Sequence, residues 1–95
     1  MKDLTALRGE LDALDRQLVR LFEQRMDLAR EIAAWKMARQ VPVLDAAREE
    51  AVLASRAGML NNDAREEAVR DLFREIMRLS RREQETMMKE AKNHA

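Results

Sequence analysis

The sequence has no cysteine, and its 95 residues include only one histidine, one proline and two glycines. Without cysteine the chain forms neither disulfide bonds nor a thiolate metal site, and a lone His94 cannot anchor a histidine cluster. The same scarcity disfavours a serine or cysteine nucleophile activated by histidine. We therefore expect no metal site and no covalent catalysis.

Long apolar runs and an excess of one charge are also missing. No segment approaches the ~20 apolar residues of a membrane span, and the N-terminal residues Met1–Leu4 lack the apolar core of a signal peptide. The 18 basic and 18 acidic residues cancel, so no overall field attracts nucleic acid or an anionic membrane. We expect a cytoplasmic protein that binds neither, and in which any anion is held by a local group of cations.

The sequence does contain a long helical repeat of apolar residues. From Leu4 to Trp35 the repeat advances in alternating steps of three and four residues, with one arginine in place of an apolar residue. This spacing predicts a helix from a cap at Asp3 or Thr5 to about Met37. The total length suits a single domain that spans residues 1–95.

Two further helices are expected after an extended connector around Pro42. A short helix should begin at an Asp45 cap and end near Gly58 in a left-handed stop. A capping box at Asp63–Glu66 should open a third helix that frays beyond Met88. Its inward-facing stripe is predicted to consist of Val69, Leu72, Phe73, Ile76, Ser80, Gln84, Met87 and Ala91.

The length of the first helix constrains the assembly. At ~1.5 Å per residue this helix measures ~50 Å, whereas a compact domain of 95 residues has a radius of gyration of only ~12 Å. The two later helices are too short to cover its apolar face. We expect an all-α fold of one long, one short and one long helix in an intertwined homodimer. The alternative is a bent first helix that closes a monomeric three-helix bundle.

Three polar residues occupy positions where the helical repeat calls for apolar ones: Arg25 in the first helix, and Ser80 and Gln84 in the third. A buried guanidinium is costly unless it is paired, so Arg25 should meet either an acidic side chain in an internal salt bridge or an anionic ligand. Ser80 can instead bond a carbonyl of its own helix. Gln84 can instead mark the point where the stripe ends.

Helical geometry relates Arg25 to two other cations. Lys36 lies eleven residues further on, rotated by ~20° and displaced by ~16 Å, so both side chains can reach one small ligand. Arg8 lies ~25 Å before Arg25 and points ~100° away. It cannot share that ligand within one straight helix, but a partner's Arg8 can return to the site in an antiparallel dimer.

The predicted second helix carries Asp45, Arg48 and Glu49 on one face. Each of these residues can also have a purely structural role. Asp45 can serve only as the helix cap, and Arg48 with Glu49 can form an ordinary surface pair.

Taken together, these segments resemble the all-helical class of chorismate mutases over almost the whole chain. The resemblance is carried by Arg8 in an opening Leu-x-x-Leu-Arg pattern and by three segments that follow in order. They are Arg25-x-x-Leu28-x-x-x-Ile32-x-x-x-Lys36, Pro42-Val43-Leu44-Asp45-Ala46-Ala47-Arg48-Glu49 and Phe73-x-x-Ile76-x-x-x-Ser80-x-x-x-Gln84.

The resemblance implies that the chain converts chorismate to prephenate, in phenylalanine and tyrosine biosynthesis, by a cofactor-free [3,3] rearrangement. It implies that Lys36 and Gln84 are the catalytic pair and donate hydrogen bonds to the ether oxygen. Glu49 and the backbone at Asp45 would hold the ring hydroxyl. Such a reaction needs only a bound reactive conformer and stabilised charge.

The resemblance also implies that Arg25 and a partner's Arg8 clamp the substrate carboxylates, assisted by Arg48 and Ser80.

Two other functions are alternatives to the mutase. The first is an isochorismate-pyruvate lyase of the same fold, against which Ser80 and the adjacent Arg48 and Glu49 favour the mutase. The second is a helical interaction module without an active site, which leaves the polar residues of the stripes unexplained.

Overall fold

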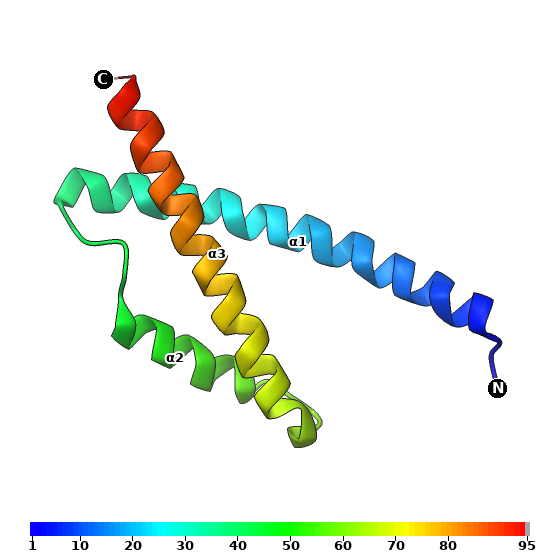
Figure 1. The fold of residues 1–95 in the computed structure, drawn as a ribbon. Helices are drawn as coiled ribbons and strands as arrows, with labels where there is room; N and C mark the ends of the chain where they lie inside the picture. Colours follow the sequence, from blue (N-terminus) through cyan, green and yellow to red (C-terminus); the bar gives the residue numbers. More distant parts are fainter. Residues whose placement is uncertain (95) are drawn as a thin grey trace.

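The computed structural model describes residues 1–94 as three α-helices and one short 3-10 turn (Figure 1). The elements are α1 (Leu4–Arg39), α2 (Ala46–Ala57), η1 (Asp63–Arg65) and α3 (Glu66–Asn93). Helix α3 contacts both α1 and α2, and Figure 1 shows it crossing the C-terminal half of α1. The predicted all-α fold of one long, one short and one long helix is confirmed.

Helix α1 is continuous, and its N-terminal half projects away from the other two helices (Figure 1). The described chain therefore measures 58 × 28 × 14 Å with a radius of gyration of 17.0 Å, well above the ~12 Å of a compact domain. The bent first helix of the monomeric alternative is absent from residues 1–94. None of the helices in this range is long and apolar enough to cross a membrane.

The ends of α1 are fixed by hydrogen bonds to its caps. The carboxylate of Asp3 accepts from the backbone N–H of Ala6 at 2.8 Å, which selects Asp3 over Thr5 as the cap. The helix ends at Arg39, two residues beyond the predicted end at about Met37. The helix stops where Gln40 adopts a left-handed conformation with φ of 55°.

Helix α2 begins as predicted, because the Asp45 carboxylate accepts from the backbone N–H of Arg48 at 2.9 Å. Gly58 does follow the last residue of the helix, but the expected left-handed stop is wrong. Its φ is −66°, in the right-handed region, and its N–H still donates to Ala54 O at 3.1 Å. The chain leaves α2 by prolonging the helical turn.

Both predictions for the ends of α3 were wrong. The segment Asp63–Glu66 forms no capping box, because Asn62 supplies the cap and Asp63 opens the 3-10 turn instead. The helix also continues five residues beyond Met88 to Asn93. In this last part, the guanidinium of Arg30 on α1 donates to the Glu90 carboxylate at 2.5 Å, which links the end of α3 to α1.

Small residues mediate the crossing of α1 and α3. The buried residues of α1 are Met26, Ala29 and Ala33, and alanines one turn apart allow a second helix to approach closely. Leu28 and Ile32, which belong to the predicted stripe, remain 57% and 48% exposed. The stripe thus identified the correct side of α1 but not the residues that α3 covers.

The remaining core joins α2 to α3. Val52, Leu53 and Met77 form a buried cluster, against which Phe73 packs. Met77 was not in the predicted stripe of α3, whereas Leu72 was, and Leu72 is 53% exposed. The face of α3 that packs inward is therefore rotated slightly from the face predicted by the repeat.

We expect Leu53→Ala to lower the free energy of unfolding by about 2 to 5 kcal/mol, because it removes most of a buried side chain and leaves a cavity. Urea unfolding followed by circular dichroism, at one fixed chain concentration, measures the change. The matched control is Leu72→Ala on the exposed side of α3, for which the change should stay within about 0.5 kcal/mol. Equal losses for the two variants would show that this cluster is not the core.

Candidate functional site

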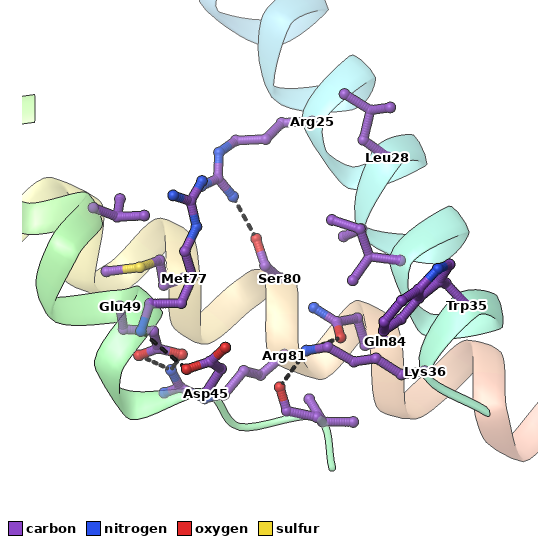
Figure 2. A pocket seen from close by; sticks show the side chains of 15 residues that line it. Arg25, Leu28, Trp35, Lys36, Asp45, Glu49, Met77, Ser80, Arg81 and Gln84 are labelled. Atoms are coloured by element: carbon purple, nitrogen blue, oxygen red, sulfur yellow. Dashed lines mark hydrogen bonds and ion pairs between the residues drawn. The ribbon is translucent and has the colours of Figure 1, made fainter. Parts of the chain in front are cut away.

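Residues of all three helices line a cavity of about 480 Å³ (Figure 2). This volume is typical of small-molecule sites. Part of its wall is apolar and includes Leu28, Ile32 and Trp35 of α1. The rest is polar and comes from all three helices and from Asp45, the cap of α2. Figure 2 shows these polar side chains converging on a common space.

The structure brings seven of the eight predicted site residues to this cavity. The exception is Arg8, which lies on the projecting half of α1, ~25 Å along the helix from Arg25. The functional roles of all eight stay predictions. The seven residues that line the cavity are Arg25, Lys36, Asp45, Arg48, Glu49, Ser80 and Gln84.

Arg25 is held by a serine and not by an acid. Its Nη1 donates to Ser80 Oγ at 2.7 Å, while the Ser80 hydroxyl donates to Ile76 O of its own helix at 2.9 Å. Within residues 1–94 the guanidinium forms no ion pair, so the internal salt bridge offered as an alternative is wrong. Partial burial lowers the pKa of Arg25, and the nearby charges of Arg56 and Arg48 lower it further.

The side chain of Lys36 links α3 to the segment between α1 and α2. Its Nζ donates to the carbonyl of Val43 at 2.6 Å and to Oε1 of Gln84 at 3.2 Å. Gln84 is only 7% exposed, so it packs against the helices, and the interpretation of Gln84 as a frayed stripe is wrong. Because the amide uses its oxygen for Lys36, its NH₂ group stays available to donate to a ligand. Two donors thus lie side by side in the cavity (Figure 2).

The carboxylates of the cavity are both engaged. Asp45 caps α2, which is the structural role offered for it from the sequence. Glu49 does not pair with Arg48, since both of its oxygens accept from Nη1 of Arg81 at 2.5 Å. Arg81 was not among the site residues predicted from the sequence. The available signal was its position three residues before Gln84, which places both on one side of α3.

Positive charge predominates in the cavity. Within the described range, four of its lining residues are cations and two are carboxylates. Arginine and lysine donors held on a rigid frame suit the carboxylates of a small anion and any negative charge that develops on it. The cations are Arg25, Lys36, Arg48 and Arg81.

The fold and the cavity define an all-helical domain whose cation-rich cavity has a size and charge that suit a small organic anion. The chorismate mutase type II family matches residues 7–85, so the chain belongs to that family. The resemblance found in the sequence is confirmed, and neither the lyase nor the interaction module is favoured.

The chain is also similar to a curated protein of Haemophilus influenzae, called T-protein. The two are 35% identical over 81 residues, which cover 79% of this chain and 21% of that relative. The chain therefore spans about a fifth of the length of the relative it matches. No solved structure matches it.

We expect Arg25→Met to raise the free energy of unfolding of the ligand-free protein by about 0.5 to 2 kcal/mol, the range that is common when a substitution relieves unfavourable charge. The substitution keeps the length of the side chain and removes a partly buried cation from the neighbourhood of Arg48 and Arg56. Urea unfolding at fixed concentration measures the difference. Arg82→Met, on the exposed side of α3, is the control and should change little. A clear destabilisation by Arg25→Met would show that the bond to Ser80 is chiefly structural.

Proposed function

We propose that the chain catalyses the rearrangement of chorismate to prephenate in this cavity, without a cofactor, as a step of aromatic amino acid biosynthesis. The observation that carries the proposal is the meeting of Lys36 and Gln84 at 3.2 Å, beside Arg25, in a cavity with an excess of cations. A unimolecular rearrangement needs a bound reactive conformer and donors aimed at developing charge. The cytoplasmic location expected from the sequence stays a prediction.

The substrate carboxylates bind at the Arg25 end of the cavity in this proposal. A guanidinium fork matches a carboxylate with two parallel hydrogen bonds. Ser80 holds the Arg25 guanidinium at 2.7 Å, which limits its motion and leaves its other N–H groups free for the ligand. Arg48 lies on the same cavity wall and assists.

The breaking ether bond lies between Lys36 and Gln84. As the C–O bond lengthens, negative charge grows on the oxygen, and two donors that already face it need no reorganisation. The carbonyl of Val43 anchors the Lys36 ammonium from the opposite side. An amide donates at any ordinary pH, so this pair acts without a protonation step at Gln84.

The ring hydroxyl of the substrate is assigned to Glu49 and the backbone at Asp45. Glu49 is oriented toward the cavity by its ion pair with Arg81. A carboxylate has about four lone-pair directions, and Arg81 uses one on each oxygen. The remaining directions can accept a hydrogen bond from a hydroxyl group.

The assembly that we propose is an intertwined homodimer in which each cavity receives the partner's Arg8. The support comes from the projecting half of α1, whose large apolar side chains are 44% to 61% exposed in the single chain. Such a contiguous apolar surface is typical of a subunit interface. The residues of this stripe are Leu4, Leu7, Leu11, Leu14, Leu18 and Leu21.

We expect the purified protein to convert chorismate to prephenate, and Lys36→Ala to lower kcat by about 100- to 1000-fold, the usual cost of losing one donor to developing charge. Helical content by circular dichroism should be unchanged, because Lys36 is partly exposed on a long helix. Near-normal turnover would reject the role of Lys36. Parallel incubation with isochorismate tests the lyase, since formation of salicylate and pyruvate instead of prephenate would favour that activity.

We expect Arg8→Ala and Lys36→Ala chains, each nearly inactive alone, to regain activity when they are mixed, unfolded and refolded together. In a heterodimer one cavity combines an intact Lys36 with an intact Arg8. Random pairing of equal amounts should restore about a quarter of wild-type activity.

Mixing Lys36→Ala with Gln84→Ala chains is the matched control for this complementation. Both residues belong to the cavity of one chain, so every heterodimer cavity still lacks one of them and activity should not return. Absence of recovery with Arg8→Ala, in heterodimers verified by mass spectrometry, would contradict the shared cavity.

A further inference from the structure

One charged side chain of the cavity is assigned to no group of the substrate in the mechanism above. Arg81 lies on α3 between Ser80 and Gln84, lines the cavity, and points across it to Glu49 on α2 (Figure 2). A single nitrogen, Nη1, lies 2.5 Å from both oxygens of the Glu49 carboxylate. The two side chains are 30% and 25% exposed, so solvent screens this pair less than it screens an ordinary surface pair.

Glu49 would otherwise be in competition with the substrate. It is a flexible carboxylate in a cavity that also contains the cations Arg25, Lys36 and Arg48, and any of these is an attractive partner for it. A substrate dianion needs the same cations. An ion pair between Glu49 and one of them would reduce the number of positive charges available to the ligand.

The contact with Arg81 removes this competition. It fixes both oxygens of Glu49 against α3, while Arg48, the residue before Glu49, forms no side-chain hydrogen bond within the described part of the chain. It also adds a positive charge that offsets the Glu49 carboxylate near a binding site for anions. The lone pairs that Arg81 leaves unused remain available to a hydroxyl group.

We propose that Arg81 is a positioning residue, which holds Glu49 in place to accept the ring hydroxyl of the substrate and keeps it away from the cations that bind the carboxylates. The proposal rests on the proposed function, since it needs Glu49 to bind that hydroxyl. Arg81 acts through Glu49 and makes no contact of its own with the substrate.

A double-mutant cycle on Arg81→Met and Glu49→Gln tests this role, with kcat and KM for chorismate measured for each chain. Arg81→Met should raise KM about tenfold, as expected for loss of a charge-assisted hydrogen bond, and should change kcat by less than about threefold. In the Glu49→Gln background the same substitution should change KM by less than about twofold, because no carboxylate remains to be positioned.

Two variants separate positioning from a structural role. Arg81→Lys should keep most of the affinity, since one nitrogen contacts both carboxylate oxygens and an ammonium can replace it. Arg82→Met, one residue further along α3 and exposed, should leave KM and kcat within about twofold of wild type. Ligand binding without turnover can be followed by the emission of Trp35, the only tryptophan, which lines the cavity.

The outcomes are distinct. Loss of the Arg81→Met effect in the Glu49→Gln background, with rescue by lysine, supports the proposal. Additive effects of the two substitutions would overturn it, since Arg81 would then act on the substrate independently of Glu49. The same additive result accompanied by a loss of helical content would overturn it in favour of a structural link between α2 and α3. A wild-type chain that forms no prephenate would overturn the proposed function itself.

Discussion

The crossing of α1 and α3 determines the geometry of the cavity. Arg25 and Lys36 lie ~16 Å apart along α1, too far apart for their backbones alone to define a small site. Helix α3 presents Ser80 and Gln84 one turn apart, ~6 Å along its own axis, and each bonds one of the two cations. The long side chains therefore bend toward each other, and α3 sets the spacing between them.

This convergence has an electrostatic cost that the rest of the cavity must offset. Arg25, Arg48 and Arg56 lie close enough for the latter two to lower the pKa of the first. Within residues 1–94 no acid neutralises Arg25, so the frame holds repelling charges in place through packing and neutral hydrogen bonds. The supporting packing is modest and consists of alanines at the α1–α3 crossing and the cluster around Leu53. An anionic ligand removes part of this repulsion when it binds.

Local patterns in the sequence were sufficient for the number of helices and for the cap at Asp45, because a cap depends on residues within one turn. They left Asp3 and Thr5 as alternatives for the first cap, and they placed the start of the third helix at a capping box that does not form. These patterns also failed to predict which residues are buried where one helix packs on another. The repeat in α3 indicated Leu72 and omitted Met77, since a crossing helix covers one neighbour and exposes the next.

The candidate site shows the same division. Seven of its residues could be identified because the resemblance ties them to fixed spacings, and the structure places them on one cavity. The role of Arg81 was harder to identify: its position near Gln84 indicates a shared side of α3, but its partner Glu49 lies 32 residues away and only the packing of α2 on α3 brings the two together. A contact over this separation leaves no periodic signal in the chain, whereas Ser80 and Gln84 stand out in a helical repeat.

The leucine stripe ahead of Arg25 is also a feature for which the sequence does not identify a packing partner. It predicts burial without naming what buries it, and in the single chain its residues remain exposed. Because α1 supplies this stripe, the alanines of the crossing and a wall of the cavity, a partner that packs on the stripe would also fix the helix from which Arg25 and Lys36 project.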